Sequence, residues 1–157
     1  MKALALANYL VEDSICRRAW VSNLQLQKIL YCLQLRSLKE SSWRHPLLDD
    51  DFEAWRCGPV VREVYWAYSR NAGLKIMKVA RMQDARLAMS DVPAWVEACF
   101  DAIMQQRPGL LINFCWRMGG AWQRSYVCGM SCSIPLALMA EEARQISAEK
   151  EKYEWLS

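Results

Sequence analysis

Apolar residues recur at three- and four-residue intervals along most of the chain, the spacing of an α-helix with one buried face. The most regular stretch is residues 23–39, where Leu26, Ile29 and Leu33 share a face. Further apolar side chains, including Tyr31, extend this face around most of the helix. A helix that is apolar on nearly all sides is buried by several neighbours. We therefore expect residues 23–39 to form the central helix.

Turn and capping residues predict where the other elements begin and end. Ser22 stands before the central helix with Gln25 three residues later, the register of a capping box. Residues 51–55 alternate between polar and apolar positions, which indicates a brief extended segment. Gly58 ends that segment, and Pro59 is suited to the first turn of a following helix. The remaining expected helices cover about 3–12, 60–71, 91–108, 110–118 and 134–153, with a helix or turn at 121–130 and a strand or irregular segment at 74–82.

These elements predict a mainly α fold: a single compact helical domain, residues 1–157, with six or seven helices and at most a small β element. The length of 157 residues is sufficient for one such core. No apolar run reaches the roughly eighteen residues that span a bilayer. The first residues resemble a short signal peptide, but polar residues return at Asn8, Glu12 and Asp13. We expect a cytoplasmic protein without a membrane segment.

Candidate catalytic and metal-binding residues are few. The seven cysteines are odd in number and form no CxxC pair, and His45 is the single histidine, so no zinc-finger spacing can be built. Such cysteines indicate a reducing compartment. The acidic run 49–51 is better explained as a turn or a cap beside a helix than as a metal site, because consecutive carboxylates converge poorly on one ion. No glycine-rich phosphate loop is present. We expect no enzyme, metal or cofactor.

Charge and tryptophan content bear on the partner. The net charge of +3 does not by itself favour nucleic acid, although basic residues gather between 70 and 86. A solvated edge is the preferred interpretation of these residues, and a regulator that binds DNA phosphates is the weaker alternative. Eight tryptophans is an unusual number, and tryptophan is enriched at protein interfaces. Most are expected in or beside the core, with two or three forming a partner-binding surface.

Three segments carry a resemblance to a known family: residues 8–11 (NYLV), 24–34 (LQLQKILYCLQ) and 46–65 (PLLDDDFEAWRCGPVVREVY). Looser similarity follows at 120–126 (GAWQRSY) and 133–135 (SIP). Together they resemble the Panacea domain, the SocA-like antitoxin family, which also includes phage-associated GepA-type proteins. Relatives often carry a His-containing segment before the closing Trp, and this chain differs there.

The resemblance implies a non-catalytic helical protein that neutralises a cognate toxin by forming a complex with it. The alternative is a phage or mobile-element effector that uses the same scaffold to bind a host defence or regulatory protein. A small toxic neighbour in the genome would favour the first. The oligomeric state is left open. We assign the family signature to the scaffold, at Leu26, Lys28, Tyr31, Phe52, Trp55, Gly58, Pro59, Val60, Tyr65 and Trp122.

A scaffold shared by proteins with different partners must vary where it touches them, so contact residues are expected outside the signature. Aromatic and arginine side chains in loops or on helix edges are the natural candidates. We predict partner contacts at Trp43, Arg44, Trp66, Arg70, Arg81 and Trp116.

Overall fold

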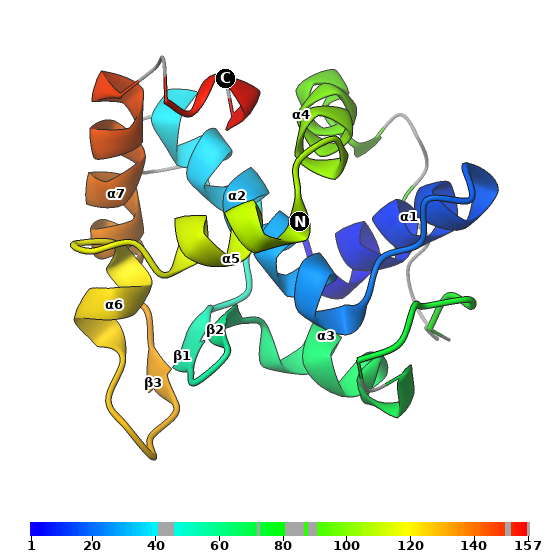
Figure 1. The fold of residues 1–157 in the computed structure, drawn as a ribbon, viewed down its shortest axis with the longest axis horizontal. Coiled ribbons are helices and arrows are strands. Elements are labelled where there is room, and N and C mark those ends of the chain that lie inside the picture. Colours follow the sequence, from blue (N-terminus) through cyan, green and yellow to red (C-terminus); the bar gives the residue numbers. More distant parts are fainter. Residues whose placement is uncertain (41–45, 72, 81–86, 88–90, 150–151, 157) are drawn as a thin grey trace.

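The computed structural model describes residues 1–40, 46–71, 73–80, 87, 91–149 and 152–156. This part of the chain contains seven α-helices and a small three-stranded sheet, which lies at one side of the fold (Figure 1). The predicted mainly α fold with a small β element is confirmed. None of the described helices is long and apolar enough to cross a membrane. The elements are α1 Ala3–Cys16, α2 Asn23–Glu40, β1 Glu53–Trp55, β2 Gly58–Val60, α3 Arg62–Ala67, a 3-10 turn Ser69–Asn71, α4 Ala94–Met104, α5 Pro108–Cys115, α6 Ala121–Ser125, β3 Cys132–Ser133, α7 Leu136–Ala148 and a 3-10 turn Glu154–Leu156.

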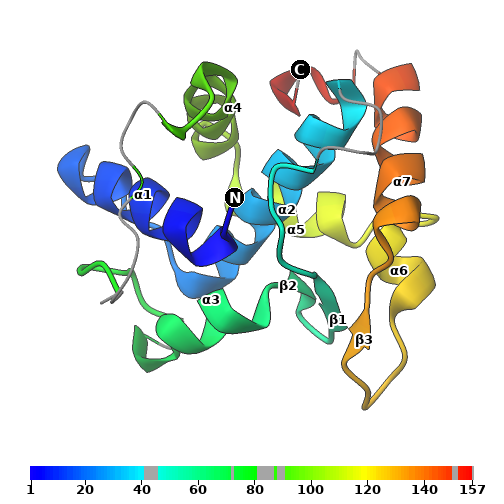
Figure 2. The same ribbon diagram turned by 180° about the vertical axis from the view of Figure 1, so that it is seen from behind.

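Helix α2 is the centre of the fold, as its pattern predicts. It packs against α1, α3, α4, α5, α7 and β2 (Figures 1 and 2). Its predicted capping box is present: the Ser22 N–H donates to Gln25 Oε1 at 3.0 Å, and the Gln25 N–H donates to Ser22 Oγ at 3.3 Å. Both hydrogen bonds satisfy backbone N–H groups that would otherwise have no partner at the start of the helix.

The sheet is antiparallel, with strand order β2-β1-β3. Strands β1 and β2 form a hairpin in which Trp55 pairs with Gly58, so Arg56 and Cys57 make a two-residue loop. Gly58 has φ +109°, a conformation that side chains other than hydrogen rarely allow. Figure 2 shows the hairpin beneath α2, with β3 alongside it.

The predicted role of Pro59 at a helix start is wrong. Pro59 lies in β2 opposite Ala54, and the next helix begins only at Arg62, after Val61. Proline lacks an N–H, which an edge strand tolerates. Strand β2 is such an edge. Because Gly58 turns the chain back immediately, the extended segment continues past the glycine as a second strand.

The boundaries of other elements also differ from the predicted ones. Helix α1 extends to Cys16, four residues beyond its predicted end. Pro108, expected near the end of a helix, is the first residue of α5, while α4 ends at Met104. The pairing of β3 with β1 was not predicted. The acidic run does act as a helix cap: Asp50 Oδ2 accepts the Ala3 N–H at 2.7 Å in the first turn of α1.

Candidate partner-binding site

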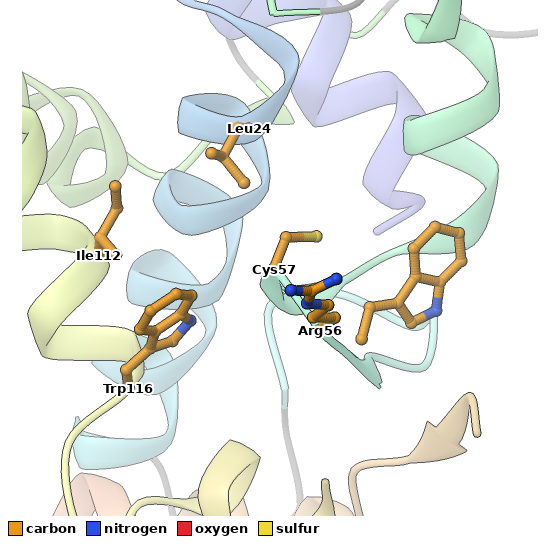
Figure 3. A pocket seen from close by; sticks show the side chains of 6 residues that line it. Leu24, Arg56, Cys57, Ile112 and Trp116 are labelled. Carbon is orange, nitrogen blue, oxygen red and sulfur yellow. The ribbon is translucent and has the colours of Figure 1, made fainter. Parts of the chain in front are cut away.

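A pocket of about 410 Å³ opens between α5 and the tip of the β1–β2 hairpin, above the first turns of α2 (Figure 3). Leu24 comes from α2, and the hairpin and α5 supply the facing walls. Apart from one arginine the lining is apolar, as in most sites that hold a side chain or a small molecule. The residues that line the pocket are Leu24, Trp55, Arg56, Cys57, Ile112 and Trp116.

Aromatic rings continue from the pocket over the neighbouring surface. Trp116 stacks on Trp122 with ring centroids 5.7 Å apart, and Trp122 stacks on Tyr126 at 5.1 Å. The Trp122 indole N–H donates to the carbonyl oxygen of Trp55 at 2.9 Å, which ties this stack to the hairpin. Trp116 remains 45% exposed despite these contacts. A large, partly solvated indole held rigidly by its neighbours is the kind of side chain that anchors protein interfaces.

A second group of rings lies on the other side of the hairpin. Trp55 packs against Tyr65 at 4.8 Å, and Tyr65 meets Trp66 edge-on at 5.3 Å. Glu53 orients Trp55 by accepting its indole N–H at 2.7 Å, and it also accepts two hydrogen bonds from Arg62, both 2.8 Å. Arg62 lowers the pKa of the Glu53 carboxyl. The hairpin therefore joins two aromatic groups into one surface, which we call the aromatic surface: Trp55, Tyr65, Trp66, Trp116 and Tyr126, with the buried Trp122 linking the two groups.

A buried polar cluster supports this surface from below. Glu142 of α7 is 1% exposed and accepts hydrogen bonds from the Tyr31 hydroxyl at 2.5 Å and the Ala121 N–H at 2.7 Å. Arg117 forms an ion pair with Glu142 at 2.7 Å. Burial raises the pKa of Glu142, and Arg117 opposes that rise. Since Ala121 begins the helix that carries Trp122, the cluster fixes α6 against α2 and α7.

Lys28 is the second buried charge. Its side chain is 1% exposed, and its ammonium donates to the Pro59 carbonyl at 3.4 Å. Burial lowers the pKa of Lys28, and three nearby cysteine thiols act in the opposite direction. All seven cysteines of the chain are free. Among the described residues, no three His, Cys, Asp or Glu side chains gather where they would hold a metal ion.

The structure places the predicted signature residues mostly in the core. Trp55 and Tyr65 are half-buried, whereas the other eight are buried. Of the predicted partner contacts, Trp66, Arg70 and Trp116 are exposed. Trp66 and Trp116 lie on the aromatic surface, while Arg70 lies in the 3-10 turn after α3. Trp43, Arg44 and Arg81 are outside the described residues.

Sequence reasoning missed four pocket residues: Leu24, Arg56, Cys57 and Ile112. Leu24 and Ile112 were read as helix residues, although each helix has its own core-facing row. An apolar residue outside the core-facing row is the sequence signal that could have indicated a pocket. In the structure Leu24 is such a residue, and it is 38% exposed. Arg56 and Cys57 occupy a hairpin loop that was not predicted, so nothing in the pattern marked them.

Comparison with known proteins gives a family and one curated relative. Residues 26–94 match the model of the family described as Antitoxin SocA-like, Panacea domain. Antitoxin SocA of Caulobacter vibrioides (strain NA1000 / CB15N) is 38% identical over 82 residues. The aligned part covers 52% of this chain but 43% of that protein, so the chain spans less than half of the relative's length. No solved structure gives a significant match.

Proposed function

We propose that this chain is a non-catalytic cytoplasmic antitoxin that binds a cognate protein toxin directly, because residues 26–94 match the model of the SocA-like antitoxin family's Panacea domain. Neutralisation then follows from the complex itself. The curated relative is named an antitoxin, which supports the role. The free cysteines fit a reducing compartment.

The aromatic surface is the observation that carries the proposal. Trp66 is 60% exposed at one end of it and Trp116 is 45% exposed at the other. Ring contacts and the hydrogen bond from Trp122 to Trp55 hold the residues between them in place. Rigid exposed tryptophans lose little conformational freedom on binding, and they supply much of the binding energy in protein complexes.

Co-expression with the product of the adjacent open reading frame tests the proposal. We expect the antitoxin to restore growth and to co-purify with the toxin as a stable complex. Trp116→Ala should weaken the complex at least tenfold, as expected for an anchor residue that becomes buried when the partner binds. Leu74→Ala is the matched control, because Leu74 is 75% exposed but lies outside the pocket and the aromatic surface. Growth rescue without a detectable complex would contradict direct binding.

A further inference from the structure

The ammonium group of Lys28 is buried with too few acceptors. A lysine ammonium has three N–H donors. Within the described part of the chain it makes one hydrogen bond, the 3.4 Å contact with the Pro59 carbonyl. A buried charge of this kind is costly unless it is paired. Its lowered pKa has the same cause, desolvation by burial. An added acceptor, above all a negatively charged one, would therefore stabilise the protonated form of Lys28.

Gly58 leaves room for this ammonium group, which lies directly against the backbone of the hairpin. A Cβ atom at this position would lie 2.4 Å from Lys28 Nζ and 3.1 Å from Trp116 Nε1. Both nitrogen atoms thus lie close to the place where a side chain at residue 58 would begin, and a glycine is needed there to make room for the ammonium group. The Trp116 indole N–H makes no hydrogen bond to any described residue. Two donors converge here without a shared acceptor.

This point adjoins the pocket. Trp116 and Cys57, the residue before Gly58, both line it. Lys28 follows Leu24 by four residues on α2, so the two lie on the same face of the helix, one turn apart. Among the described residues of the lining, Arg56 is the one that carries a charge, and it is also basic. An occupant that matches the pocket has an apolar body and a negative charge.

We propose that this pocket receives a large apolar side chain of the toxin with the carboxylate of an adjacent acidic residue, which accepts hydrogen bonds from the Lys28 ammonium and the Trp116 indole N–H. The apolar side chain contacts Leu24 and Ile112, and the carboxylate lies over Gly58. The assignment rests on the proposed function for the identity of the partner. The chemistry of the pocket can be tested without that partner.

The first experiment uses 3-phenylpropionate and its neutral analogue 3-phenylpropionamide as probes, with the full chain in ¹H–¹⁵N NMR titrations. Trp116→Phe identifies the indole signal. We expect the signal to shift on titration and the carboxylate to bind at least tenfold more tightly than the amide. Lys28→Met should remove this preference. Lys75→Met removes the same charge at an exposed site and should leave the preference unchanged. Equal binding of the two probes, no binding, or an unaltered preference in Lys28→Met would overturn the proposal.

The second experiment uses the complex with the adjacent gene product. We expect Lys28→Met to weaken the complex at least tenfold while its circular dichroism spectrum stays that of the wild type. We also expect 3-phenylpropionate to compete with the toxin. A complex that is indifferent to Lys28→Met would overturn this use of the pocket and leave the antitoxin role standing. Absence of any complex with the wild-type chain would instead count against the antitoxin role.

Discussion

Glu142→Ala should strongly destabilise the described core. Its carboxylate accepts two hydrogen bonds and pairs with Arg117, which is itself 15% exposed at the side chain. Removing one partner of a buried ion pair costs about 3–5 kcal/mol, because the remaining charge stays desolvated. The Tyr31 hydroxyl and the Ala121 N–H lose their acceptor as well. Against a total stability of about 5–15 kcal/mol for a domain, this loss is large.

Urea denaturation followed by circular dichroism measures the change in the free energy of unfolding. Glu141→Ala is a matched control, because the neighbouring Glu141 pairs with Arg124 at 2.6 Å but both side chains are more than 40% exposed. Exposed pairs contribute little. We expect the control to unfold at nearly the wild-type urea concentration. A loss below about 1 kcal/mol for Glu142→Ala would refute the argument from burial.

A double-mutant cycle separates the ion pair from the other contacts of Glu142. Arg117→Ala alone leaves the Glu142 carboxylate without its cation, so it should destabilise the protein strongly. In the Glu142→Ala background no buried carboxylate loses its cation when Arg117 is replaced, so the same substitution should lower the free energy of unfolding much less. The coupling between the two sites should reach about 1–3 kcal/mol. Simple additivity would show that the hydrogen bonds, and not the ion pair, support α6.

Three further perturbations test other parts of the structure. Trp55→Ala should cost about 2 kcal/mol, less than the 3–5 kcal/mol of a fully buried tryptophan, because the ring is half-buried although it packs on Tyr65. Urea denaturation checks this, and no loss of stability would contradict the assignment of Trp55 to the scaffold. Ser22→Ala should cost about 1 kcal/mol by removing the cap that Ser22 and Gln25 form, seen as a lower melting temperature. The pKa of Lys28 is lowered in the folded state, so between that pKa and the ordinary lysine value the unfolded chain binds more protons and stability rises with pH. Lys28→Met should remove this rise, which is read as the difference in unfolding free energy between the two proteins across alkaline pH; parallel curves would contradict it.

The helices were predictable where local signals were unambiguous. The apolar face of α2 and the capping box at Ser22 and Gln25 appear in the structure as expected. Proline was the main source of error, because it is suited both to an edge strand and to the first turn of a helix. Pro59 was expected at a helix start and lies in an edge strand, whereas Pro108 was expected near a helix end and begins α5. At Pro59 only the pairing of β1 with β2 distinguishes a strand from a helix start, and a strand of three residues is too short to give a recognisable alternation in the sequence.

The candidate site was less predictable than the fold, for a physical reason. Its walls come from Leu24, the hairpin loop at 56–57 and Ile112, which are far apart in sequence and meet only through the packing of α5 on α2. Trp116 could be singled out, since a tryptophan next to a helix end is a natural interface residue. The proximity of the Lys28 and Trp116 nitrogen atoms to Gly58 could not be predicted from the sequence, because it depends on the positions of the side chains.

The hairpin changes how the family signature should be understood. From sequence alone, its residues are a scaffold and the partner is bound elsewhere. In the structure, Gly58 serves both purposes: its positive φ closes the hairpin, and its missing side chain makes room for the Lys28 ammonium beside the pocket. A methionine at Lys28 would fill the core without the cost of a buried charge. A charge at this position lowers stability, and the proposed binding role of Lys28 would account for that cost. The scaffold and the proposed contact surface therefore share residues at the tip of the hairpin, while α5, beyond the region that matches the family, supplies the opposite wall.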